Sequence, residues 1–277
     1  MAGEAKTTNF MLGTATVMIG NPEDLYDFTP ETHSVGLVKN FTVEAQKSRT
    51  DLTQGRTNDI VFSLTTGADT RGTFEMYEYT EANIAYALGL DGGEIVEIEG
   101  DPHVVSTEST FASGEITLTL AEGEGQNIEI GNTVSLRDEG SENIIIGTVS
   151  TVSGITDGTA AASASITVKI PALDSALTIP AGAYVSLVTV LEIGSTDVDR
   201  DLAAKVTGQL ANGVWVTLLI PKFRVTSGLT MAFGTDNFGN TPFEFTPLKV
   251  TPADTFYSTF KGTTGKLYMD SAAGKLA

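Results

Sequence analysis

Three closely spaced aspartates form the most obvious candidate for metal chemistry. The stretch STDVDRD (195–201) places Asp197, Asp199 and Asp201 at alternate positions, and alternating carboxylates can supply oxygen ligands to calcium. An EF-hand loop would also need Gly at its sixth position and Glu at its twelfth, where this chain has Leu202 and Gly208. We therefore favour a solvated loop here, with a metal site as the alternative.

Residue types suited to catalysis form no recognisable motif. The chain has no cysteine, which excludes disulfides, thiol nucleophiles and Cys-ligated zinc. His33 and His103 lie in polar sequence outside any nucleophile elbow or HExxH motif, and the chain has no P-loop. A glycosidase pair could be hidden among the 35 acidic residues, but no spacing selects one. We expect no enzymatic activity and no cofactor.

The charge balance is strongly acidic. A formal charge of −19 argues against tight nucleic-acid binding, which depends on Lys and Arg neutralising phosphates. It is compatible with a surface that nucleic acid passes without sticking, and it favours solubility before assembly. The N-terminus lacks a basic region followed by an apolar one, and no apolar run approaches the roughly 18 residues of a membrane span. We therefore expect no signal peptide and no membrane span.

The elements that must position these residues are mostly strands. Segments rich in Val, Ile, Thr and Phe alternate with turns along the chain, which has 29 glycines. The pattern predicts one short helix, at 80–89, which Thr80 caps and Gly89 ends, with Ile84, Ala85 and Leu88 on one face. The predicted fold class is all-β with one short α-helix.

The composition changes in the middle of the chain. Between about residues 100 and 190 the basic residues are only Arg137 and Lys169, and the aromatic ones only Phe111 and Tyr184. Short strands and Gly-rich turns there are typical of a small β-barrel or an immunoglobulin-like sandwich. We predict an inserted domain at 98–194 within a host domain formed by 1–97 and 195–277.

A long polar segment separates two predicted strands. The sequence AQKSRTDLTQGRTN (45–58) is longer than most connections between strands, and long ordered loops are usually functional. Its basic residues in an acidic chain suggest contact with another copy, head to tail, which builds rings or filaments. We predict that Lys47, Arg49, Asp51 and Arg56 make contacts between subunits and between rings.

The range 228–250 alternates apolar with small or polar residues on both sides of a turn. The pattern predicts a long β-hairpin. Phe243 and Phe245 alternate with Glu244 and Thr246, so one face of the return strand can pack on a core while the other presents polar groups.

The order of these elements resembles the tail tube proteins (major tail proteins) of long-tailed bacteriophages. The resemblance rests on SVGLVKNFTVEAQKS, the polar segment, IVFSLTTGADTRGTFEMYEYTEANIAYALGLDG and the closing PKFRVTSGLTMAFGTDNFGNTPFEFTPLKV. It covers roughly residues 10–95 and 200–260. The middle segment resembles extra domains that some of these proteins carry on the outer surface of the tube.

The resemblance implies a tail-tube-type β-sandwich or barrel domain that assembles into hexameric rings, stacked as a tube. The tube would be part of the virion tail, assembled in the host bacterial cytoplasm, and would conduct double-stranded DNA without binding its sequence. Implied partners are a tape measure protein and tail terminator and baseplate proteins, with a sheath protein only if the tail is contractile. In such a tube we predict that Thr230, Glu244 and Thr246 face the lumen.

Two other functions are compatible with the sequence. A carbohydrate-binding or adhesion module would use the insertion, although sugar sites usually need exposed aromatic residues. A capsid decoration protein would bind preformed capsids and would not form tubes.

Overall fold

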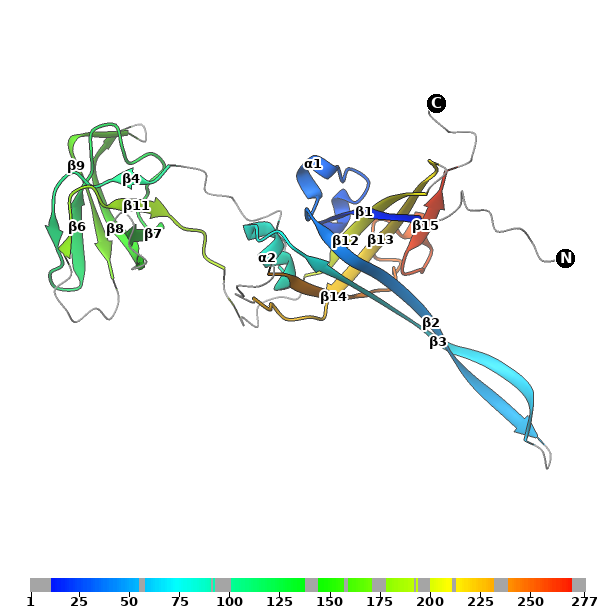
Figure 1. Ribbon diagram of the computed structural model, residues 1–277. Helices are drawn as coiled ribbons and strands as arrows, with labels where there is room; N and C mark the ends of the chain where they lie inside the picture. The colour runs from blue at the N-terminus through cyan, green and yellow to red at the C-terminus, as the bar shows by residue number, and fades with distance from the viewer. Residues whose placement is uncertain are drawn as a thin grey trace. The chain divides into compact units, whose positions relative to one another are not determined.

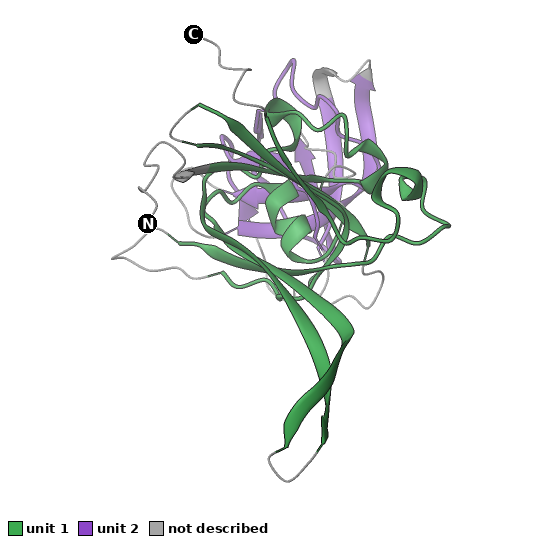
Figure 2. Cartoon of the chain, turned by 90° about the vertical axis from the view of Figure 1, so that its right-hand side faces the viewer, with its two compact units in different colours: residues 1–95, 193–277 green, residues 96–192 purple. Residues whose placement is uncertain are grey.

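The computed structural model describes residues 11–54, 58–90, 92, 101–137, 144–156, 159–170, 178–191, 193, 200–210, 213–231 and 239–270. The chain divides into two compact units, unit 1 (residues 1–95 and 193–277) and unit 2 (residues 96–192), coloured separately in Figure 2. Most described residues lie in antiparallel strands. The prediction of an all-β fold with little helix is confirmed. No helix in the described ranges is long and apolar enough to span a membrane.

Unit 1 is built on one antiparallel sheet (Figure 1). Its strands lie in the order β1 (Met11–Gly20), β12 (Leu202–Leu210), β13 (Trp215–Val225), β14 (Thr241–Pro247), β3 (Asp59–Met76) and β2 (Val38–Gln54), and β15 (Lys266–Met269) pairs with β13. The first described strand of the chain lies beside the first described strand after unit 2, because β12 pairs with β1 from Met11–Leu210 to Gly20–Ala203. The described strands of this sheet do not close into a barrel.

Aromatic side chains fill the core on one face of this sheet. Phe74 stacks on Phe243 with ring centroids 4.6 Å apart, and Phe223 lies 4.8 Å from Phe245. All four rings are buried. The register explains the cluster, because Phe74 is directly opposite Phe243 in the β3–β14 ladder and cross-strand partners project from the same face.

Helix α2 (Glu81–Ala87) contributes to the same core. The Thr80 side chain accepts a hydrogen bond from the Asn83 backbone N–H, as an N-cap does. The predicted helix is confirmed, but its buried residues differ from those expected, since Ile84 and Leu88 are only half-buried. Asn83 is buried because its amide donates to the carbonyl oxygens of Val35 and Glu78.

The opposite face of the sheet is covered over part of its width. The shorter helical turns are η2 (Pro22–Asp24), α1 (Pro30–His33) and α3 (Tyr257–Phe260). Leu25 and Phe28 from the acidic segment 21–32 and Phe260 from α3 are buried in a second cluster. The acidic segment is therefore packed against the sheet through these two apolar side chains.

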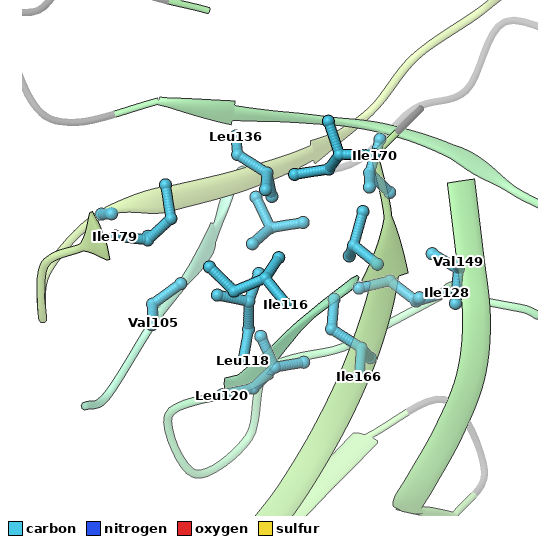
Figure 3. Packing of buried hydrophobic residues seen from close by; sticks show 14 of the residues in the cluster. Val105, Ile116, Leu118, Leu120, Ile128, Leu136, Val149, Ile166, Ile170 and Ile179 are labelled. Atoms are coloured by element: carbon cyan, nitrogen blue, oxygen red, sulfur yellow. The ribbon is translucent and has the colours of Figure 1, made fainter. Parts of the chain in front are cut away.

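Unit 2 has its own aliphatic core (Figure 3). One sheet has the order β4 (His103–Val104), β11 (Tyr184–Leu187), β7 (Thr133–Arg137), β8 (Ile144–Thr156), β9 (Thr159–Lys169) and β6 (Glu115–Thr119), and a second pairs β5 (Ser109–Thr110) with β10 (Thr178–Ile179). The described strands do not close into a barrel. Ile116, Leu118 and Val168 are among its fully buried side chains.

Candidate functional site

A long two-stranded ribbon is the most conspicuous functional feature of unit 1. Strands β2 and β3 remain paired from Val38–Met76 out to Gln54–Asp59 (Figure 1). Every described residue from 44 to 69 is exposed. We call residues 44–54 and 58–69 the arm.

The arm corrects the prediction of a fourteen-residue loop at 45–58. The polar residues there extend β2 to Gln54, and β3 begins at Asp59. The prediction failed because it treated a run of polar residues as evidence against a strand. A ribbon that is exposed on both faces needs no apolar alternation, since cross-strand pairing and side chains such as Thr50 and Thr53 are enough to support it.

The apolar side of the ribbon changes from one face to the other along its length. Near the body, Val43, on the core side, is opposite Gly72, and Glu44 is opposite Arg71 on the other face. The register shifts between Ser48 and Arg49, where β3 contains one more residue than β2. Because of the extra residue, odd-numbered residues of β2 are opposite even-numbered residues of β3 before the bulge and opposite odd-numbered ones directly after it. Such a bulge therefore brings a different set of β3 side chains to each face of the ribbon.

We call the residues beyond this bulge, 49–54 and 58–65, the distal arm. There, Leu52, Phe62 and Leu64 lie on the face that is polar nearer the body. Leu52 is opposite Phe62, and Leu64 is opposite Thr50. Leu52 is 62% exposed, Phe62 58% and Leu64 55%. The folded chain therefore holds a cluster of large apolar side chains in solvent, which usually marks an interaction surface.

Three of the four predicted contact residues lie on the face of β2 opposite to that of Leu52. Lys47, Arg49 and Asp51 are alternate residues of β2, and all three are exposed. Arg49 is opposite Thr65 and Asp51 is opposite Ser63. The structure thus places three of the four predicted residues together on one polar strip, while Arg56 lies outside the described residues. The sequence analysis did not select the apolar face, although the alternation of Phe62 and Leu64 with Ser63 and Thr65 in the sequence could have indicated it.

A polar sheet surface lies on the opposite side from the phenylalanine core. Glu244 is opposite Thr73, and Thr73 is opposite Thr42, with the two hydroxyls 2.6 Å apart. Glu75 is on the same side of β3, and hydrogen bonds from the Tyr77 hydroxyl and the Asn40 amide hold the pKa of its carboxyl below the ordinary value. The Glu75 carboxyl is therefore ionised at neutral pH.

The predicted hairpin at 228–250 is not a single ribbon. Of the described residues in this range, only 241–247 form a strand, and β14 pairs with β3 and with Phe223–Val225 of β13. Residues 232–238, at the predicted turn, lie outside the described residues. The alternation in the sequence indicated the two faces of β14 but not its partner strands. Its pairing with β3 involves the stacking of Phe243 on Phe74, which is distant in the sequence.

Among the residues predicted to face a lumen, Glu244 and Thr246 lie in β14 and Thr230 lies outside the described strands. Glu244 and Thr230 are exposed, and Thr246 is half-buried. Phe243 and Phe245 point into the core. These positions agree with one apolar and one polar face for β14.

The aspartate segment ends in an ion-pair cluster. Asp201 contacts Lys222 at 2.8 Å and Arg224 at 2.8 Å, and Lys222 also contacts Asp254 at 3.3 Å. Burial would raise the pKa of Asp201, but the hydrogen bonds from Lys222 and Arg224 outweigh it and hold that pKa below the ordinary value. Asp197 and Asp199 lie outside the described residues. Within the described ranges, no three His, Asp or Glu side chains are grouped as metal ligands would be.

Both histidines have structural contacts. His33 stacks on Phe28 with centroids 4.6 Å apart. His103 is buried in unit 2, where its Nδ1 lies 3.0 Å from Glu124 Oε2 and its Nε2 lies 3.0 Å from the Gln126 carbonyl oxygen. These contacts account for both residues as parts of the fold.

Comparison with known proteins adds no family to these observations. No model of a protein family matches the chain, and no curated protein matches its sequence significantly. Function must therefore be inferred from the arm, the polar sheet surface and the charge of the chain.

Proposed function

We propose that this protein is a tail tube subunit of a long-tailed bacteriophage, which assembles into stacked hexameric rings. The observation that carries the proposal is the arm. Leu52, Phe62 and Leu64 are each more than half exposed on this ribbon. Their exposure is unfavourable in a monomer, because the transfer of apolar surface out of water lowers the free energy. Docking of the arm on another copy would bury that surface, and one heterologous contact repeated between copies generates rings or a filament.

The polar sheet surface suits the wall of a channel for double-stranded DNA. Four strands from each of six subunits, about 4.8 Å apart, give a circumference of roughly 115 Å and a backbone diameter of roughly 37 Å, which admits a duplex. The acidic residues Glu75 and Glu244 on this surface would repel phosphate over roughly 8 Å at physiological salt. The net charge of −19 supports passage without binding.

The proposal includes the partners of such a tube. A tape measure protein would occupy the lumen before DNA, terminator and baseplate proteins would bind the two ends, and a sheath would surround the tube only in a contractile tail. Unit 2, which has a core of its own, would be carried on the outer surface. The protein would function in the virion after assembly in the bacterial cytoplasm.

Charge reversal on the arm tests the proposal. The purified protein should form large assemblies in sedimentation velocity experiments. Arg49→Glu should raise the concentration needed for assembly by at least about tenfold, which corresponds to about 1.4 kcal/mol, without changing the circular dichroism of the monomer.

The matched control is Arg137→Glu, which makes the same change of charge at an exposed residue of unit 2. It should assemble like the unmodified chain. A protein that remains monomeric at high concentration and low salt would contradict the proposed function. Equal assembly by Arg49→Glu and the control would contradict the role of the arm.

A further inference from the structure

A second apolar surface lies at β15, on unit 1. Leu267 is 62% exposed, Met269 60%, Trp215 49% and Tyr268 43%. Residues 267–269 are consecutive, and Trp215 lies beside them because its carbonyl accepts a hydrogen bond from the Asp270 backbone N–H. We call these four residues the β15 patch. Leu267 and Met269 project from one face of β15, and Tyr268 projects from the other face, which it shares with Trp215. Large exposed apolar side chains on both faces of a short edge strand indicate an interaction surface.

The β15 patch also has an open strand edge. Among the described strands, β15 pairs only with β13, through Val216–Met269 and Leu219–Lys266. Unpaired backbone N–H and C=O groups at a sheet edge favour association with another strand. A partner with a strand edge and apolar side chains would therefore satisfy both properties of the patch.

The distal arm has both of these properties. Its apolar face presents Leu52, Phe62 and Leu64, and the only described partner of β2 is β3, so the outer edge of β2 is open. The arm does not cover the patch of its own chain, because all of its described residues are exposed. The base of the arm approaches the turn before β15, where the Thr70 and Thr264 hydroxyls are 3.4 Å apart, and the distal part extends away from the rest of unit 1 (Figure 1).

We infer that the β15 patch is the receptor for the distal arm of a second copy of this chain. The inference deepens the proposed function and rests on it, since it names the surface that an arm engages in the assembly. The contact is heterologous, because arm and receptor are different surfaces, and each copy offers one of each. It therefore propagates from copy to copy and does not stop at a dimer.

The charges at the rim of the two surfaces complement each other in one orientation. Lys266 and Asp270 flank the β15 patch at its two ends, four residues apart, and Lys47 and Asp51 have the same spacing and order on β2. If β2 approaches β15 antiparallel, Asp51 lies near Lys266 and Lys47 lies near Asp270. Complementary rim charges favour one orientation of docking, so we assign the antiparallel one.

Disulfide trapping in trans tests the inference directly, because the chain has no cysteine of its own. One preparation carries Thr50→Cys, on the apolar face of the distal arm, and a second, distinguishable by an affinity tag, carries Leu267→Cys. Mild oxidation of the mixture should yield a tagged–untagged dimer, since a disulfide requires Cα atoms within about 7 Å. The matched control carries Ser63→Cys, on the opposite face of the same ribbon, in place of Thr50→Cys. It should give at least tenfold less tagged–untagged dimer.

Removal of the patch provides an independent readout. Leu267→Ser with Met269→Ser should abolish assembly in sedimentation experiments while leaving the circular dichroism of the monomer unchanged. The control is Ile144→Ser with Ile146→Ser, which removes two exposed apolar side chains from unit 2 and should assemble normally.

The outcomes separate the inference from the proposed function. If the unmodified chain forms tubes but neither the disulfide nor the effect of the patch variant appears, the β15 receptor is wrong and the tube proposal stands. If the disulfide forms in trans but the chain never forms tubes, the receptor is supported and the tube proposal is wrong. Equal trapping at Thr50 and Ser63 would overturn the assigned face.

Discussion

Gly72 is a position at which the core of unit 1 leaves no room for a side chain. It is opposite Phe245 in the β3–β14 ladder and opposite Val43 in β2. A Cβ atom there would lie 2.0 Å from Cζ of the buried Phe245 ring. The absence of a side chain at Gly72 therefore lets the phenylalanine core continue beneath the base of the arm.

Gly72→Ala should lower the free energy of unfolding of unit 1 by about 1–3 kcal/mol, as overpacking of a core usually does. Denaturant unfolding followed by Trp215 fluorescence measures it, since the chain has one tryptophan. The matched control is Gly67→Ala in the exposed part of β3, where the atom nearest to the added Cβ would be Ser48 Cβ at 3.9 Å. Equal stability of the two variants would contradict the packing described.

The ion pairs of Asp201, Lys222 and Asp254 make the stability of unit 1 depend on pH in the acid range. A backbone hydrogen bond from Thr251, together with Lys222, holds the pKa of Asp254 below its ordinary value, and the pKa of Asp201 is also lowered. An acid with a lowered pKa stabilises the fold fully above its unfolded pKa, about 3.8–4, and this contribution is lost as the pH falls through the folded-state pKa.

Lys222→Met should therefore make unit 1 less stable at pH 7, by about 1–2 kcal/mol, and less sensitive to acid below about pH 4. Trp215 fluorescence at a series of pH values measures both effects. Lys249→Met, at an exposed lysine, should retain the pH profile of the unmodified chain. An unchanged profile for Lys222→Met would show that the ion pairs contribute nothing to stability.

At the scale of the elements, the arm is notable because the core of unit 1 does not bury its distal apolar side chains. Its proximal part joins the phenylalanine core, while beyond the bulge its apolar side chains point away from any described residue that could bury them. The change of face separates two roles along one ribbon. The base anchors the arm in the core, and in the proposed assembly the distal part offers its apolar face to another copy.

Phe62→Ser with Leu64→Ser should abolish assembly and change the stability of the monomer by only about 0.5 kcal/mol, because both side chains are more than half exposed. Sedimentation and thermal unfolding measure the two effects separately. The matched control is Ser63→Ala with Thr65→Ser on the opposite face of β3, which should assemble normally. Tubes formed by Phe62→Ser/Leu64→Ser at the concentration that the control requires would exclude the apolar face as a contact.

The sequence predicted those elements whose signals are local. Thr80 and Gly89 delimit α2 through backbone hydrogen bonding and a positive φ of 77° at Gly89, and Phe243 and Phe245 reveal the inward face of β14. The pairing of β14 with β3 depends on contacts about 170 residues apart in the chain, as judged from the partners Phe74 and Phe243, which local patterns do not encode. The arm was not predicted because its two strands are stabilised by pairing with each other and not by burial in a core.

At the scale of the whole molecule, each unit has its own hydrophobic cluster. Unit 1 uses phenylalanines, whereas unit 2 uses Ile, Leu and Val. The strands β1 and β12, which precede and follow unit 2 in the chain, pair directly with each other. The sheet of unit 1 therefore does not need unit 2 to bring its strands together.

Residues 96–192, expressed alone, should fold cooperatively, with a free energy of unfolding of about 5 kcal/mol or more. Circular dichroism during denaturant unfolding measures it. Leu118→Ala should lower that value by about 2–5 kcal/mol, since Leu118 is fully buried. A fragment without a cooperative transition would show that unit 2 depends on unit 1.

Electron cryomicroscopy of the purified full-length chain, concentrated at low salt, tests the central claim most directly. The account predicts tubes of stacked sixfold rings, with Glu244 directed into the lumen, Phe243 and Phe245 directed into the subunit core, and unit 2 on the outside. A monodisperse monomer under these conditions would contradict the account, and so would a tube whose channel is lined by the phenylalanine side of β14.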